Sequence, residues 1–225
     1  MNTSESQLKM HYGACPKKLE ARFQTIIKTY KEHYNINHIP KDKQYWSICG
    51  RCSYQMNQLE PYCEPDQLVK EKLITPQQFF GVEICEEIFN FNNSNKDFNW
   101  FLGDFYETIV EYANNNEFKP AIVNVDMLLM PKFGVEYLSR IMHFLDSIKE
   151  TNIMLIGNFI MKSRHQVAKK EDIMNGLQKE AMFQDAMSNG NWNIHNDFYL
   201  YNGTGKTRTK MGTVILFKAK EKVIK

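Results

Sequence analysis

Apolar residues follow two alternating patterns along the chain, one with helical spacing and one in short continuous runs. The first helical pattern begins at Pro16, where the missing N–H costs nothing in the first turn, and it continues to Tyr34. Further helices are predicted over residues 65–74, 86–91, 105–114, 137–148 and 167–188. Continuous apolar runs, typical of strands buried on both faces, cover residues 45–49, 79–84, 100–102, 120–125 and 153–156.

The end of the chain has a different pattern. Residues 198–201 and 212–217 are apolar runs on either side of a turn rich in Gly and Thr, which predicts an antiparallel hairpin. Strands alternating with helices predict an α/β fold, a seven-stranded, mostly parallel sheet with helices on both faces and this hairpin at its C-terminal end. We expect residues 1–44 to form an N-terminal tail and helical extension, and residues 45–225 to form the α/β domain.

Composition narrows the class of protein. The chain has 225 residues, of which 43% are hydrophobic and 13% aromatic, and this is typical of a folded globule. Its net charge of +2, from 28 basic and 26 acidic residues, demands neither a nucleic-acid nor a membrane partner. No apolar run approaches the roughly 20 residues that a membrane span needs, and the N-terminus lacks a signal-peptide core. We therefore expect a cytoplasmic protein.

The five cysteines are Cys15, Cys49, Cys52, Cys63 and Cys85. An odd number at irregular spacing is a poor disulfide framework, so free thiols are the simplest interpretation. The Cys49-x-x-Cys52 pair with Cys63 could begin a zinc site or a redox motif, but no fourth ligand is evident nearby. We expect no metal, with these cysteines as small residues of a tight loop.

Three acids fall at successive strand ends. Glu83 ends the second predicted strand, Asp104 follows the third, and Asp126 ends the fourth. Ligands of open α/β sheets bind outside the carboxyl ends of the strands, where an acid can accept hydrogen bonds from both ribose hydroxyls of a nucleotide-like cofactor. The alternative is that these acids cap the helices that follow them.

With this order of elements, the chain resembles the class I S-adenosylmethionine-dependent methyltransferases over roughly residues 45–217. Residues 79–84 resemble the family's second strand with its ribose-binding acid, and residues 102–105 resemble its third-strand segment. Residues 121–131 resemble the fourth strand and the catalytic segment, and the final hairpin resembles the family's antiparallel sixth and seventh strands.

The resemblance implies S-adenosylmethionine as cofactor and methyl transfer as the reaction. It assigns Glu83 to the ribose, Asp104 to the adenine end, and Gly50 to close backbone approach. It assigns Asp126 to orienting or deprotonating the methyl acceptor, whose identity the sequence does not reveal.

Two segments depart from the family pattern. The first loop, residues 48–53, has one glycine and no acid, and Asp126 is followed by Met-Leu-Leu-Met-Pro rather than Pro-Pro-Tyr. The alternative function is therefore a catalytically inactive binding or structural subunit. Lys206, Arg208 and Lys210 could contact the phosphate backbone of a nucleic-acid acceptor, or could form an ordinary solvated edge.

Overall fold

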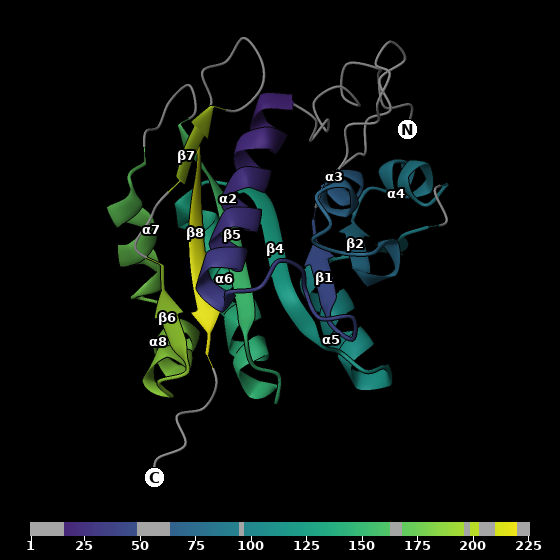
Figure 1. The fold of residues 1–225 in the computed structure, drawn as a ribbon. Coiled ribbons are helices and arrows are strands. Elements are labelled where there is room, and N and C mark those ends of the chain that lie inside the picture. The colour runs from purple at the N-terminus through teal and green to yellow at the C-terminus, as the bar shows by residue number, and fades with distance from the viewer. Residues whose placement is uncertain are drawn as a thin grey trace. The chain divides into compact units, whose positions relative to one another are not determined.

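A computed structural model describes residues 16–48, 64–94, 97–162, 168–195, 199–202 and 210–219 (Figure 1). The chain divides into two compact units, residues 1–108 and residues 109–225, and the division falls inside helix α5 (Phe105–Asn115). Among the described residues, no helix combines the length and the apolar character that crossing a membrane would require.

The first unit contains a segment of parallel sheet in which β2 (Phe79–Glu83) lies between β1 (Gln44–Ser47) and β3 (Asn99–Leu102). Its helices are α2 (Pro16–Tyr34), α3 (Glu64–Lys70), the short 3-10 helix η1 (Pro76–Gln78) and α4 (Glu86–Asn92). Helix α2 thus has the predicted bounds.

Aromatic side chains fill both faces of these three strands. Trp46 stacks on Phe80 with ring centroids 4.7 Å apart, and on the other face Phe79 meets Trp100 edge-on at 5.4 Å. Gly81 makes room for the Trp100 ring, because a Cβ at position 81 would lie 2.3 Å from its Cζ3 atom. Such ring pairs stabilise the sheet beyond their buried area.

The second unit contains β4 (Pro120–Leu129), β5 (Ile153–Lys162) and β8 (Lys210–Lys218). Strand β5 pairs with β4 in parallel and with β8 in antiparallel orientation. Since β5 covers one edge of β8 along its whole length, β6 (Trp192–Ile194) and β7 (Tyr199–Asn202) share the other edge.

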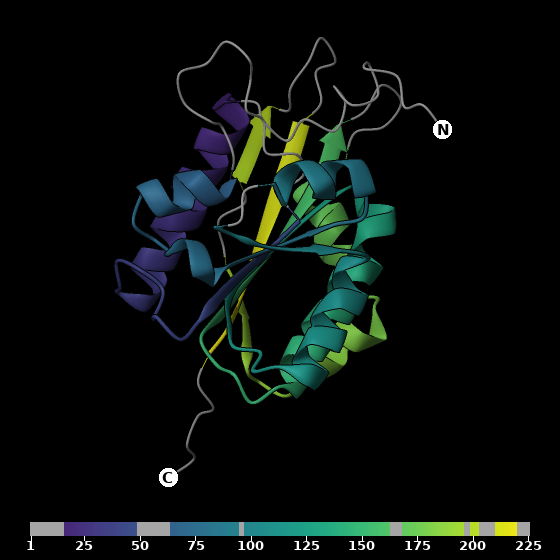
Figure 2. The same ribbon diagram turned by 90° about the vertical axis from the view of Figure 1, so that its right-hand side faces the viewer.

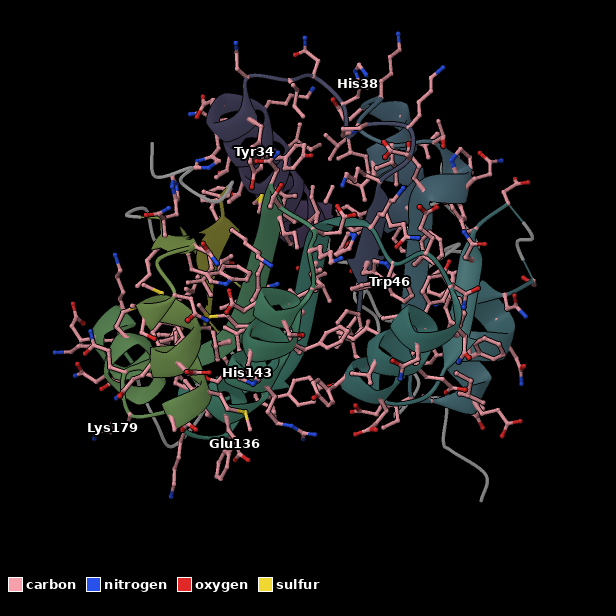
Figure 3. All side chains as sticks on the ribbon, turned by 90° about the horizontal axis from the view of Figure 1, so that it is seen from below. Tyr34, His38, Trp46, Glu136, His143 and Lys179 are labelled. Carbon is pink, nitrogen blue, oxygen red and sulfur yellow. The ribbon has the colours of Figure 1, made fainter. Side chains whose placement is uncertain are left out.

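Three helices complete the second unit: α6 (Pro131–Ser147), α7 (Lys170–Leu177) and α8 (Ala181–Ser188). Helices α6 and α8 lie on one side of strands β5 and β8 (Figure 2). Leu138 of α6 lies directly against Gly157 of β5, and His143 Nδ1 of α6 lies 3.4 Å from the Asp185 carboxylate of α8 (Figure 3).

The predicted fold class is confirmed. The described strands are mostly parallel with an antiparallel C-terminal end, and they take three strand positions in the first unit and four in the second. These are the seven positions of the predicted sheet. Strand β7, which was predicted at residues 198–201, shares one of them with β6, which was not predicted.

Three predicted elements are corrected. Strands β4 and β5 run on to Leu129 and Lys162, several residues beyond the predicted ends at 125 and 156. The single helix predicted over 167–188 is two helices, α7 and α8, with extended backbone at Glu180. The break lets both short apolar faces pack against α6, through Ile173 and Leu177 of α7 and through Phe183 and Ala186 of α8.

Candidate functional site

Glu83 lies at the carboxyl end of β2, as predicted. Its Cα partner is Leu102, the last residue of β3, and its carbonyl oxygen accepts a hydrogen bond from Gly103 N at 3.0 Å. Its side chain is 93% buried, with Oε1 accepting the backbone N–H of Cys85 at 3.0 Å. A hydrogen bond to a carboxylate is stronger than one between neutral groups, so this contact fixes the direction of the acid over the turn after β2.

Asp104 stands at the carboxyl end of the neighbouring strand, after Gly103. Gly103 has φ +154°, a backbone conformation that favours glycine. Asp104 Oδ1 accepts the backbone N–H of Glu107 at 3.1 Å, and its carbonyl accepts the Thr108 hydroxyl at 2.6 Å. Asp104 therefore caps helix α5, the alternative role for these acids, at the same edge of the first unit as Glu83.

Two exposed apolar side chains border these acids, and the sequence prediction missed them. Ile84, directly after Glu83, is 74% exposed, and Leu102, directly opposite Glu83, is 48% exposed. Isolated exposed apolar residues are ordinary, but these two adjoin a buried acid at a strand end. An apolar residue after a strand-end acid is the sequence signal that could have found Ile84.

A second buried acid of the first unit was also missed. Glu64, the first residue of α3, is 2% exposed, and its Oε1 accepts hydrogen bonds from the Tyr45 and Ser47 hydroxyls, both at 2.7 Å. These bonds tie the start of α3 to the carboxyl end of β1. No sequence pattern around Glu64 signals a buried carboxylate.

Asp126 belongs to the second unit, and its predicted position is corrected. It does not end β4, because the strand continues to Leu129. It is instead the last residue in regular register with β5, opposite Asn158, since the next paired residue of β4 is Leu129, opposite Phe159. This irregularity resembles a β-bulge, which re-aims side chains near the ends of strands. Asp126 is 8% exposed.

Next to Asp126 runs a chain of buried polar side chains. The Thr213 hydroxyl donates to Asn158 Oδ1 at 2.7 Å, and Asn158 Nδ2 donates to Asn124 Oδ1 at 3.0 Å. All three are at most 3% exposed. This chain crosses β8, β5 and β4 and ends two residues before Asp126 on the same face of β4. A lone Asn inside an otherwise apolar strand was its sequence signal.

Most of the remaining predicted residues lie outside the part of the chain that the structure describes. These are Gly50, Cys49, Cys52, Cys63, Lys206 and Arg208. Of Lys210 only the backbone is described, where its Cα partner is Lys162. Within the described ranges, Cys85 is a free thiol, and no group of three or more His, Cys, Asp or Glu side chains could hold a metal.

Comparison with known proteins gives a fold rather than a sequence family. No protein-family model matches the sequence, and no characterised protein matches it in sequence comparison. Among solved structures, an O-methyltransferase from Bacillus cereus in complex with SAH is similar over 96% of this chain and 93% of its own, at 9% identity and a TM-score of 0.51. The N-methyltransferase NodS from Bradyrhizobium japonicum gives 90% and 97% coverage, 8% identity and a TM-score of 0.49. The first of these similarities, together with the observed strand pairing, shows that the chain has the Rossmann-like α/β fold of the class I methyltransferases.

Proposed function

We propose that this protein is an S-adenosylmethionine-dependent methyltransferase, with residues 45–225 as the methyltransferase-like domain. The observation that carries the proposal is the edge of the first unit formed by Glu83, Ile84 and Asp104. There a buried acid with a fixed carboxylate adjoins an exposed apolar side chain, and a second acid follows on the neighbouring strand.

These residues fit the adenosyl part of the cofactor. A ribose offers two hydroxyl donors, which suit a carboxylate already oriented by the Cys85 amide. The exposed face of Ile84 suits an apolar ring system. Asp104 is assigned to the adenine end, and Gly50 to close backbone approach.

When bound, S-adenosylmethionine supplies an already activated methyl group. The protein's own residues then have to hold the acceptor in line and exclude water. We assign Asp126 to orienting the acceptor or taking its proton, because it is a largely buried acid at the point where β4 departs from regular pairing.

Calorimetric titration with S-adenosylmethionine and S-adenosylhomocysteine tests the proposal. Glu83→Ala removes the ribose acceptor and should weaken binding by about 1.5–3 kcal/mol, the value of hydrogen bonds to a charged group. Glu71→Ala is the matched control, because Glu71 is an exposed acid of the same unit. Absence of binding to the unmodified protein at millimolar ligand would refute the proposal.

The second candidate is a binding or structural subunit with this fold and no catalysis. One observation favours it: the residues after Asp126, which the resemblance assigned to the catalytic segment, continue as strand to Leu129. Cofactor binding without methylation across nucleic-acid, protein and small-molecule panels would support this candidate over the first.

A further inference from the structure

We propose that Asn189 is a site of spontaneous deamidation, and that its conversion breaks a polar contact between the ends of helices α6 and α8. Asn189 directly follows the last residue of α8, and Gly190 follows it. An asparagine followed by glycine is prone to this reaction, because glycine has no side chain to obstruct its own backbone nitrogen. The only other reactant is water.

The reaction is a rearrangement of the main chain followed by hydrolysis. The backbone nitrogen of Gly190 attacks the side-chain carbonyl carbon of Asn189, the Cγ–Nδ2 bond breaks, and ammonia leaves with the proton of the Gly190 N–H. Water then opens the cyclic succinimide that remains. Opening at one carbonyl gives aspartate, and opening at the other gives isoaspartate, in which the main chain runs through the β-carbon and is longer by a methylene group.

The surroundings of the pair leave room for this attack. Gly190 has φ +73°, and a Cβ at this position would meet no atom within 4 Å. Asn189 is exposed, and its N–H lies 3.4 Å from the carbonyl of Asp185, a long hydrogen bond at the end of a helix. Helix ends fray, and such local opening costs less free energy than unfolding of the whole protein.

Two contacts hold the pair in the folded state. Gly190 N–H donates to the carbonyl of Met187 at 3.1 Å, and Asn189 Nδ2 donates to Asp146 Oδ2 in α6. Both contacts have to open before the Gly190 nitrogen attacks. The rate of conversion should therefore follow the fraying of the last turn of α8.

A second Asn-Gly pair provides a comparison within the same unit. Asn175-Gly176 lies in the last turn of α7, where a Cβ on Gly176 would lie 3.0 Å from Val135 Cγ1 of α6. The next residue, Leu177, is 0% exposed. Opening this backbone requires separating α7 from α6, so the structure ranks Asn189 above Asn175. The third pair, at 202–203, includes a glycine outside the described ranges.

Conversion would put a negative charge where the structure has a hydrogen-bond donor. Asp146 accepts Asn189 Nδ2 at one carboxylate oxygen and the indole N–H of Trp192 at the other, the latter at 2.9 Å. An aspartate at position 189 would bring a second carboxylate against Asp146, and like charges at this distance repel. Isoaspartate would also lengthen the connection from α8 to β6. The contact that joins α6, α8 and β6 would then be lost.

Peptide mapping by mass spectrometry tests the conversion. The folded protein is incubated at mildly alkaline pH, and the acid formed at residues 189 and 175 is quantified in the same samples. Conversion should be at least about fivefold faster at Asn189, which corresponds to a difference of about 1 kcal/mol in the free energy of local opening. In protein unfolded by urea the two sites should convert at similar rates, because neither backbone is held.

Gly190→Asn is the variant that slows the attack. Asparagine tolerates positive φ, yet its side chain obstructs the backbone nitrogen at position 190. Conversion at Asn189 should fall, and conversion at Asn175 should stay the same. Equal rates at Asn189 and Asn175 in the folded, unmodified protein would overturn the inference, and so would an Asn189 that stays intact in the folded protein while it converts in urea.

Two further variants test the structural consequence. Asn189→Asp introduces one product directly and should lower the urea midpoint of unfolding more than Asn175→Asp, which also adds an acid at the end of a helix. Combining Asn189→Asp with Asp146→Asn exchanges donor and acceptor, so that the new amide donates to the new carboxylate and still accepts the Trp192 N–H. This double variant should regain most of the lost midpoint. If it unfolds no later than Asn189→Asp alone, the contact with Asp146 does not transmit the change and the inference is wrong.

Discussion

At the scale of single residues, the three predicted acids have different surroundings. The Asp104 carboxylate caps a helix, the Glu83 carboxylate is held by a backbone N–H in the turn after its strand, and Asp126 lies inside a strand. The three acids are therefore suited to different roles. The Asp104 carboxylate already accepts a backbone hydrogen bond, whereas Asp126 is a largely buried acid beside an irregular pairing, which suits the role proposed for it.

Replacing Asp126 with Asn separates chemistry from structure. The change nearly preserves shape and removes the charge, so affinity for S-adenosylhomocysteine should stay within roughly threefold. Methyl transfer to any accepted substrate should fall by about 10²–10⁴-fold, the usual contribution of a positioned proton-transfer group. Calorimetry and a radiolabelled methyl-transfer assay measure the two effects. If Asp126→Asn transfers methyl groups at the normal rate, the catalytic assignment of Asp126 is wrong.

The sequence indicated the positions of Glu83 and Asp104 because each follows directly from a local pattern, an apolar run and the residue that ends it. It did not indicate that Glu64 is buried. That burial depends on hydroxyls from Tyr45 and Ser47, nearly twenty residues earlier on a different element. Contacts between segments that are far apart in the sequence produce no periodic pattern of residues that a sequence analysis could recognise.

At the scale of elements, the end of helix α6 is held by a buried lysine. Lys218, the last residue of β8, is 4% exposed, and its Nζ donates to the carbonyls of Leu145, Asp146 and Ile148 at 2.6, 3.1 and 2.7 Å. The last carbonyls of a helix lack partners within the helix and carry its negative partial charge. One ammonium group therefore satisfies the end of α6 and ties it to the sheet.

Replacing Lys218 with Met removes this cap while keeping most of the apolar stem. The buried carbonyls lose a charged donor, so the free energy of unfolding should fall by about 1.5–3 kcal/mol. Urea denaturation measures the change, with Lys149→Met as an exposed control near the same end of α6. If the free energy of unfolding falls no further in Lys218→Met than in Lys149→Met, the hydrogen bonds of Lys218 do not stabilise the protein.

Element positions were predictable, but strand lengths were not. Strand β5 continues past its predicted end at residue 156 through Gly157 and Asn158, which interrupt the apolar run. Asn158 is tolerated because Asn124 and Thr213 on the neighbouring strands satisfy its amide. The break between α7 and α8 was likewise hidden, because both halves keep helical spacing.

At the scale of the whole molecule, the near-neutral net charge says little about which residues lie at each edge of the sheet. The net charge of +2 gave no reason to expect an anionic partner. Which residues lie at one edge follows only from the pairing of the strands, which makes Lys162 and Lys210 Cα partners although they are far apart in the sequence. Fold class was therefore within reach of the sequence, whereas the composition of each edge required knowledge of which strands are neighbours.

Unfolding of the whole molecule should depend on pH in the alkaline range. Burial raises the pKa of Tyr30 and of Tyr34 above the ordinary value of 10.0, because the charged phenolate loses its hydration. The folded state then keeps protons that the unfolded chain releases, so these two groups leave stability constant below about pH 10 and lower it as pH rises further.

Circular dichroism of urea unfolding across this range measures the effect. A Tyr30→Phe, Tyr34→Phe double variant should show a shallower alkaline decline in stability than the unmodified protein. An unchanged alkaline decline would mean that other groups cause it.

The chain's three tryptophans, finally, are divided between the two units: Trp46 and Trp100 lie in the first, and Trp192 in the second. All three are at least 92% buried. Each unit thus carries its own optical reporter. A Trp192→Phe variant would emit only from the strands that end in the predicted cofactor edge, so that its emission spectrum would follow events there without contribution from the rest of the protein.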